Sequence, residues 1–159
     1  MFSQDLKYLT ASGSVVQLYN PKFDHIPGLE TQSLNKVTTL APTSTEPISQ
    51  IVWSPFPNSH FFAMALVVPQ EQTLRHEVNI FNADTQQHVS SCVIPTKVTY
   101  MLWTSKHLGH ETTSLKQSQM ILAGLQDGKI AVIKVKGVHT VRTEVLCMLS
   151  FHTTPVMYI

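Results

Sequence analysis

Charged residues are scarce in this chain. Asp, Glu, Lys and Arg together make up 13% of its 159 residues, about half the usual share in a globular domain. Eleven Lys and Arg against ten Asp and Glu leave a formal net charge of +1. So small a net charge excludes the strong overall field that draws a protein to nucleic acid or to an acidic membrane surface.

Long hydrophobic runs and glycine-rich motifs are also missing. No window approaches the roughly 18 consecutive apolar residues that a membrane span needs, and the first residues do not form a secretory signal. The six glycines form no phosphate-binding or dinucleotide-binding fingerprint, and no nucleophile elbow is present. We therefore expect a protein without a membrane span that is not an enzyme, with no catalytic, cofactor-binding or metal-binding residues.

The two cysteines are too few for a disulfide framework, and no CxxC spacing indicates zinc. Cys92 and Cys147 both lie in apolar, strand-like runs, so we expect two buried thiols. The chain contains no Asn-x-Ser/Thr glycosylation site. Together these observations favour a reducing, intracellular compartment.

Short runs rich in Val, Ile, Thr, Phe and Tyr are abundant and alternate with turn residues, whereas helical spacing is hard to find. Asp127-Gly128, between two such runs, is a strong signal for a tight hairpin, and Asn20-Pro21 also indicates a turn. The pattern predicts an all-β chain. The predicted strands cover residues 6–11, 15–20, 37–41, 48–54, 61–68, 77–82, 88–94, 98–104, 120–125, 129–135 and 143–149.

The strand pattern repeats with a period of about fifty residues. Residues 48–53 and 98–103 both read apolar-x-x-apolar-apolar-Trp, and residues 155–159 echo residues 47–51. A repeat of this length is typical of stacked β-sheets in a propeller. We predict a single incomplete propeller segment, divided into a blade tail (1–45), two blades (46–95 and 96–150) and the start of another (151–159).

On these features the sequence resembles the WD40-repeat superfamily across almost its full length. The first-strand pattern ending in Trp53 or Trp103 matches, as do the small-residue strand and the Asp-Gly turn in residues 120–134. The motifs are degenerate, because Tyr19-Asn20, Phe81-Asn82 and Ile133-Lys134 replace the Trp-Asp pair. The resemblance implies a partial WD40-like β-propeller with about two complete four-stranded blades plus parts of two flanking ones.

The hairpin at residues 123–130, Ala-Gly-x-x-Asp-Gly-Lys-Ile, is similar to blades of the WD-repeat scaffolds of the nucleolar small-subunit processome. This resemblance implies a non-catalytic scaffold for protein–protein interactions in ribosome biogenesis and rRNA processing, located in the nucleus or nucleolus. Its partners would be other protein subunits, with indirect association with RNA. The alternatives are a vesicle-coat or nuclear-pore propeller, or a standalone β-sandwich or barrel that binds a peptide or small ligand.

Propellers close with roughly 4–8 blades, so further blades or a partner are expected to complete this chain. The segments 69–75 and 106–119 are the expected variable contact segments, because loops on rigid scaffolds carry binding functions. His107 and His110, with Glu111 beside them, have a spacing that can bind a metal, but no further ligand is nearby, and we expect a solvated loop.

Two other sets of residues suggest binding roles but have simpler explanations. Trp53 and Trp103 occupy equivalent repeat positions, which predicts packing between strands rather than ligand binding. Lys129, Lys134, Lys136 and Arg142 form a modestly basic stretch that is not interleaved with aromatic residues. These basic side chains are able to contact RNA phosphates. Basic residues at such positions more commonly belong to a solvated strand edge, which lysines protect from aggregation.

Overall fold

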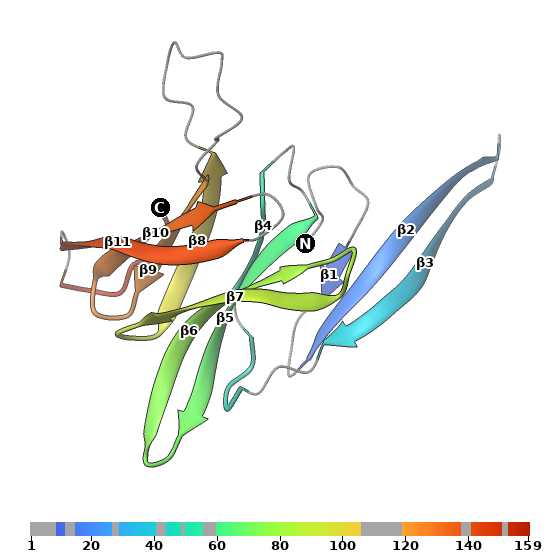
Figure 1. Cartoon of the computed structure of the whole chain (residues 1–159). Coiled ribbons are helices and arrows are strands. Elements are labelled where there is room, and N and C mark those ends of the chain that lie inside the picture. Colours follow the sequence, from blue (N-terminus) through green and yellow to red (C-terminus); the bar gives the residue numbers. More distant parts are fainter. Residues whose placement is uncertain are drawn as a thin grey trace, which may run out of the picture.

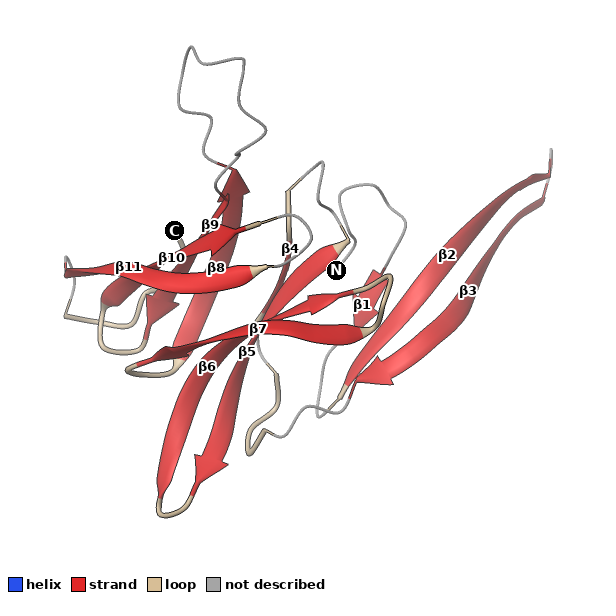
Figure 2. Cartoon of the chain, viewed as in Figure 1, coloured by secondary structure: helices blue, strands red, loops and turns tan. Residues whose placement is uncertain are grey.

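The computed structural model describes residues 9–11, 15–26, 29–40, 44–48, 50–55, 60–105, 119–137, 141–150 and 153–159. These residues form strands, turns and loops, and no helix occurs among them (Figure 2). Within these ranges there is accordingly no helix long and apolar enough to cross a membrane. The all-β prediction is confirmed.

Eleven strands form three antiparallel sheets in which each strand pairs with its neighbours in the sequence (Figure 1). The first sheet contains β1 (Leu9–Ala11), β2 (Val16–Ile26) and β3 (Leu29–Leu40). The second contains β4 (Ile51–Trp53), β5 (Phe61–Gln70), β6 (Thr73–Asn82) and β7 (Gln87–Ile94). The third contains β8 (Val98–Ser105), β9 (Gln119–Leu125), β10 (Lys129–Lys136) and β11 (Arg142–Ser150).

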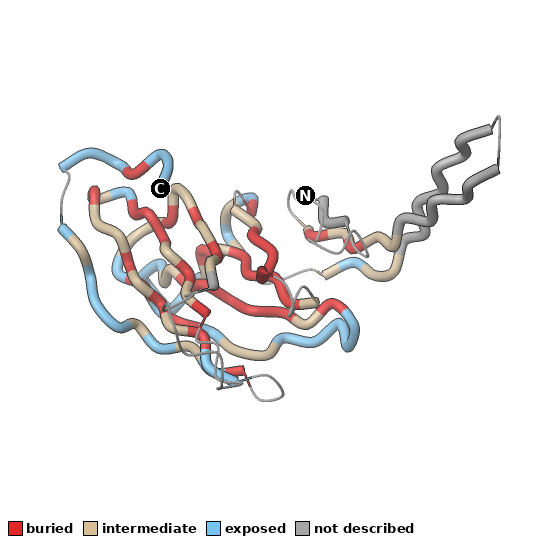
Figure 3. The backbone as a smooth tube through the Cα atoms, turned by 90° about the horizontal axis from the view of Figure 1, so that it is seen from above, coloured by how far each residue is buried: buried red, intermediate tan, exposed pale blue. Residues whose placement is uncertain are grey.

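The second and third sheets stack face to face with matching strand order. β4 contacts β8 and β7 contacts β11, so the second and third sheets meet first strand to first strand and last strand to last strand. One apolar core, which includes Val16, Leu18 and Phe62, lies between the first and second sheets. Another, which includes Val78, Ile80 and Trp103, lies between the second and third. The buried residues accordingly run along the strands of the second and third sheets (Figure 3).

The second sheet is buried on both faces, which explains the nearly continuous apolar run of β5. Successive side chains of a strand point to opposite faces. Phe62 and Met64 therefore join the core shared with the first sheet, while Phe61 and Ala63 join the core shared with the third. A strand that faces only one core would alternate apolar and polar residues.

A β-bulge interrupts each sheet at the same place, between its last two strands. The register shifts at Leu18/Tyr19 in the first sheet, at Ile80/Phe81 in the second and at Val132/Ile133 in the third. Leu18, Ile80 and Val132 are thus structurally equivalent positions, as are Tyr19, Phe81 and Ile133. These bulges align the three sheets residue by residue more reliably than their weakly similar sequences do.

Asp127-Gly128 forms the tight β9–β10 turn that the sequence predicts. Gly128 has φ 84°, a conformation that glycine adopts at little cost, and its N–H donates to the Leu125 carbonyl at 3.1 Å. Asp127 Oδ1 accepts the Lys129 N–H at 3.2 Å, and its Oδ2 lies 2.9 Å from Lys129 Nζ. Backbone and side chain together fix the turn.

We expect acid to weaken this turn. The hydrogen bond from the Lys129 side chain lowers the pKa of Asp127 below its ordinary value. The ionised carboxylate therefore stabilises the fold fully above the unfolded-state pKa of about 3.9, and the contribution is lost as pH falls through the lower folded-state pKa. An NMR titration should show the Asp127 pKa rising toward its ordinary value in Lys129→Met. An unchanged pKa would contradict this contact.

Two local expectations differ from the structure. Asn20-Pro21 lies inside β2, opposite Asn35 and Leu34 of β3, rather than in a turn. Proline is tolerated at strand positions whose N–H is not needed for the ladder, and among the described residues β1 pairs only with residues 17–19 of β2. Segment 69–75 is the tip of the β5–β6 hairpin rather than an inserted loop, because β6 begins at Thr73.

Candidate functional site

An open hollow of about 310 Å³ lies on the face of the second sheet that is turned toward the first. Its volume is at the lower end of the range typical of ligand sites. Three neighbouring strands supply its walls, which holds the lining side chains on a rigid base. The lining residues are Leu66 and Val68 from β5, Arg75, Glu77, Asn79 and Phe81 from β6, and His88 and Ser91 from β7.

A polar row runs along one side of the hollow, because alternate residues of β6 share a face. Arg75 Nη2 forms an ion pair with Glu77 Oε1, and Asn79 Nδ2 donates to Glu77 Oε2 at 3.2 Å. Glu77 is only 6% exposed and Asn79 only 7%. The buried Glu77 carboxylate thus holds the Arg75 guanidinium on one side and the Asn79 amide on the other.

Two polar atoms of this row remain available for hydrogen bonding. Within the described part of the chain, neither Arg75 Nε nor Asn79 Oδ1 has a hydrogen-bond partner, although both atoms are buried. Leaving such a group unpaired costs about 1–3 kcal/mol, so most buried polar atoms in native proteins are satisfied. A donor and an acceptor are therefore held unpaired on either side of Glu77.

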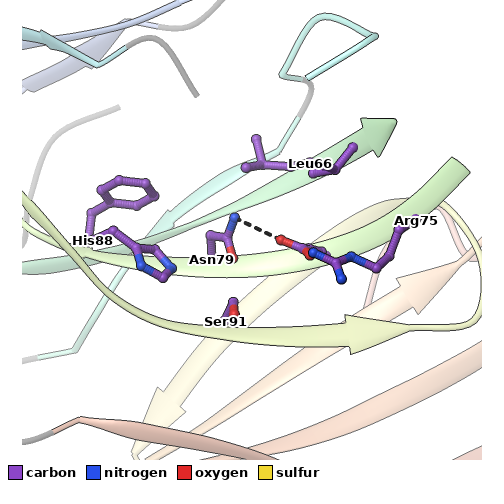
Figure 4. Close-up of a pocket in the computed structure, with 8 residues that line it drawn as sticks. Leu66, Arg75, Asn79, His88 and Ser91 are labelled. Atoms are coloured by element: carbon purple, nitrogen blue, oxygen red, sulfur yellow. Dashed lines mark hydrogen bonds and ion pairs between the residues drawn. The ribbon is translucent and has the colours of Figure 1, made fainter. Parts of the chain in front are cut away.

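The remaining lining residues complete the hollow. Figure 4 shows His88 at one end and Arg75 at the other, with Asn79 and Ser91 between them. His88 meets the edge of Phe81, with ring centroids 5.3 Å apart. The arrangement can hold a ligand by hydrogen bonds from the β6 row and by apolar contact with Leu66 and Phe81.

At the position equivalent to Asn79, the third sheet has a small apolar side chain. Asn79 pairs with Met64 across β5, and Ala131 holds the equivalent position opposite Ala123. Ala131 is fully buried between the second and third sheets. The amide of Asn79 is therefore particular to the second sheet, whereas the third-sheet equivalents of Arg75 and Glu77, Asp127 and Lys129, also form an ion pair.

Sequence analysis did not identify this row. In residues 75–81 charged and amide residues alternate with His76, Val78 and Ile80, a period-2 pattern that indicates one polar face. On a half-exposed strand this polar face would be ordinary solvent surface. In the folded chain, however, Glu77 and Asn79 are buried beside a hollow that side chains of three neighbouring strands line.

The two tryptophans pack in the cores, as predicted. Trp53 is 4% and Trp103 is 5% exposed. The Trp53 ring centroid lies 5.0 Å from that of Phe62, and Trp103 Nε1 donates to Gln119 Oε1 at 3.0 Å. Each residue sits on the face of its sheet turned toward the preceding sheet.

The prediction of two buried thiols is right for Cys92 and wrong for Cys147. Cys92 lies in the core between the second and third sheets, and this burial raises its pKa. Cys147 is exposed on β11. That strand is the last of its sheet and pairs only with β10, so an apolar run there does not imply burial.

The predicted histidine spacing at His107 and His110, with Glu111, lies outside the described residues. Among the residues that the structure describes, no group of three or more His, Cys, Asp or Glu side chains is placed to hold a metal ion. Segment 106–118 likewise falls outside them, and only Gln119 of that predicted contact segment is described.

Acidic neighbours offset part of the basic stretch. Lys129 pairs with Asp127, and Lys136 Nζ lies 2.5 Å from Glu144 Oε2. Lys136 and Arg142 are exposed near one end of the β10–β11 pair, where they face each other across the ladder. The stretch is thus a mixed-charge strand edge more than a positive patch.

The three stacked, repeating sheets can now be compared with known proteins. The sequence matches no protein-family model and none of the curated proteins. Among solved structures, a WD40 propeller chain in the crystal structure of a mitotic checkpoint complex is similar, with a TM-score of 0.62 over 99% of this chain at 16% identity. The fold is that of a partial WD40-like propeller.

The three sheets are therefore blades of a propeller. Among the described residues the second and third blades have four strands each and the first has three, and residues 153–159 follow the third blade. This confirms the expected composition of about two complete blades plus parts of two flanking ones. The chain spans 40% of the length of the propeller chain that it matches.

Proposed function

We propose that this chain is a non-catalytic scaffold that binds other protein subunits of a large assembly. The hollow on the second blade carries this proposal. It combines apolar Leu66 and Phe81 with a fixed row of hydrogen-bonding groups, in which Asn79 has an alanine as its third-blade equivalent. Such a surface suits an extended peptide segment, whose backbone offers donors and acceptors along its length.

The fold supports an interaction role. Propeller blades are rigid, and their loops and faces present binding residues without requiring a reactive group. The similar solved structure comes from a multiprotein complex, the mitotic checkpoint complex. The proposal extends to this chain only the general role of a propeller in binding protein partners.

For the assembly, we propose ribosome biogenesis, with location in the nucleolus and indirect association with RNA. The support is the hairpin at residues 123–130, which resembles blades of the small-subunit processome scaffolds. Its Asp-Gly turn is the β9–β10 turn described above. Two of the four basic residues nearby have acidic neighbours, so the RNA association that we propose runs through partner proteins.

The test is affinity purification of the tagged full chain, followed by protein identification and measurement of pre-ribosomal RNA. The comparison is Arg75→Ala/Asn79→Ala, which empties the polar row and gives Asn79 the side chain of its third-blade equivalent. Loss of about two hydrogen bonds should lower partner recovery about tenfold. Leu74→Ala, an exposed position on the same strand, is the matched control.

The outcomes separate the parts of the proposal. Recovery of coat or nuclear-pore subunits in place of pre-ribosomal RNA would contradict the ribosomal role while supporting a scaffold. Partner recovery that the double variant leaves unchanged would contradict the assignment to the hollow. If no protein is enriched over the untagged control, the scaffold function itself is wrong.

A further inference from the structure

The charged groups that line the hollow of the second blade balance each other. Arg75 Nη2 pairs with Glu77 Oε1, and Asn79 Nδ2 donates to Glu77 Oε2. Both oxygens of the carboxylate therefore already have a partner on β6. With His88 neutral, the described lining carries no net charge. Its hydrogen-bonding atoms, rather than its charge, therefore decide what the hollow binds.

The orientation of the Asn79 amide is set by its neighbour. A carboxylate only accepts hydrogen bonds, so the amide nitrogen faces Glu77 and the amide oxygen is turned away from it (Figure 4). Asn79 is only 7% exposed, and its Oδ1 has no partner among the residues that the structure describes. The hollow therefore presents a buried, unpaired acceptor.

Arg75 presents the opposite kind of group. Its Nη2 is held by Glu77, but its Nε is buried and has no partner among the described residues. The nitrogens of a guanidinium only donate hydrogen bonds. A ligand group that satisfies both unpaired atoms must therefore accept from Arg75 and donate to Asn79.

The first blade shows how the same acceptor is satisfied within the chain. The aligned bulges and strand registers make Gln17 the equivalent of Asn79 and Tyr19 the equivalent of Phe81. The Tyr19 hydroxyl donates to Gln17 Oε1. The second blade keeps an amide, but Phe81 has no hydroxyl to donate to it. The unpaired acceptor is thus a particular feature of the second blade.

We propose that the hollow binds the carboxamide side chain of an asparagine or glutamine in the partner segment. This inference rests on the scaffold function proposed above and names the chemical group that the hollow recognises. A primary carboxamide carries an acceptor and a donor on one planar head. Its oxygen accepts from Arg75 Nε and its amino group donates to Asn79 Oδ1, while Leu66 and Phe81 contact its methylene stem.

Other side chains match the two unpaired atoms less well. A carboxylate has no donor for Asn79 Oδ1, and it would bring a second negative charge beside Glu77. The head of a lysine or arginine has no acceptor for Arg75 Nε. An apolar side chain would leave both buried atoms unpaired, a mismatch that sites built from hydrogen-bonding groups reject strongly. The hollow should therefore select a neutral amide.

The test compares four peptides by NMR titration of the isotope-labelled full chain. Each peptide reads Leu-x-Leu, where x is Gln, Asn, Glu or Met, and carries acetyl and N-methylamide ends. The side chain at x is then the only primary carboxamide in the Gln and Asn peptides. We expect a carboxamide peptide to shift the Arg75 Nε–Hε signal and to bind about tenfold or more tightly than the Glu and Met peptides.

Two variants remove the acceptor in different ways. Asn79→Ala introduces the residue that the third blade has at this position. Asn79→Gln/Phe81→Tyr transplants the amide–hydroxyl pair of the first blade, which satisfies the acceptor within the chain. Each should lower the preference for the Gln peptide over the Met peptide about fivefold, the effect of one hydrogen bond. Leu74→Ala, exposed and outside the lining of the hollow, should keep the full preference.

The outcomes separate this inference from the scaffold function. Equal or tighter binding of the Glu peptide, no shift of the Arg75 signal with any peptide, or a preference that neither variant lowers would overturn the carboxamide assignment. Partner recovery that still depends on the hollow would then leave the scaffold function standing. Conversely, a clear carboxamide preference in a chain that enriches no protein partner would contradict the scaffold function alone.

Discussion

Replacing Phe62 by alanine will lower the free energy of unfolding by about 3–5 kcal/mol. The Phe62 side chain is fully buried on β5, and its ring centroid lies 5.0 Å from that of Trp53 and 5.7 Å from that of Phe81. It belongs to the core that holds the first blade against the second. The loss should appear as a lower urea midpoint with an unchanged slope.

Leu74→Ala is the matched control, because this residue is exposed at the start of β6. Surface substitutions of this kind change stability by about 0.5 kcal/mol or less. If Phe62→Ala cost no more than Leu74→Ala, the first blade would not be packed on the second in solution. The measurement is made on the full chain with its wild-type C-terminal segment.

Trp103→Phe will cost about 2–4 kcal/mol, through two separate effects. The smaller ring leaves space in the core between the second and third blades. The substitution also removes the indole N–H that donates to Gln119 Oε1 at 3.0 Å. Gln119 is buried, and its Nε2 has no hydrogen-bond partner in the described structure, so the amide would lose its hydrogen bond to Trp103 and stay buried.

A double-mutant cycle separates the two effects. Gln119→Met keeps a similar volume and removes the amide. In combination with Trp103→Phe it should therefore recover about 1 kcal/mol relative to the sum of the single changes. Chemical denaturation of the four proteins gives the coupling energy. A coupling energy of zero would show that the hydrogen bond contributes nothing to the packing of β8 on β9.

Local sequence patterns were sufficient to predict the strands and the packing of the two tryptophans in the cores. The Asp-Gly turn at residues 127–128 depends only on the conformational freedom of Gly128 and on an adjacent acceptor, both readable from sequence. The repeat of Trp53 at Trp103 indicates a shared packing position, because stacked units need the same bulky residue in the same place. Neither conclusion needs long-range information.

The predictions that were wrong concern features that depend on neighbouring strands. Pro21 continues β2 opposite Leu34 of β3, and none of the described residues pairs with it on the β1 side. Cys147 is exposed because β11 is the last strand of its sheet, whereas Cys92 is covered by the third blade. The two cysteines lie in the same kind of apolar run, and only the packing against neighbouring elements differs.

The sequence by itself determined the all-β class, the repeat of about fifty residues and the likeness to a WD40 propeller. Those features reside in the spacing of apolar, aromatic and turn residues along the chain. The tertiary structure alone decided which faces are covered. In the folded chain Glu77 and Asn79 are buried beside a hollow, whereas Ile130 and Val132 are only half-buried. Burial is a property of two surfaces in contact, and the strand pattern describes only one of them.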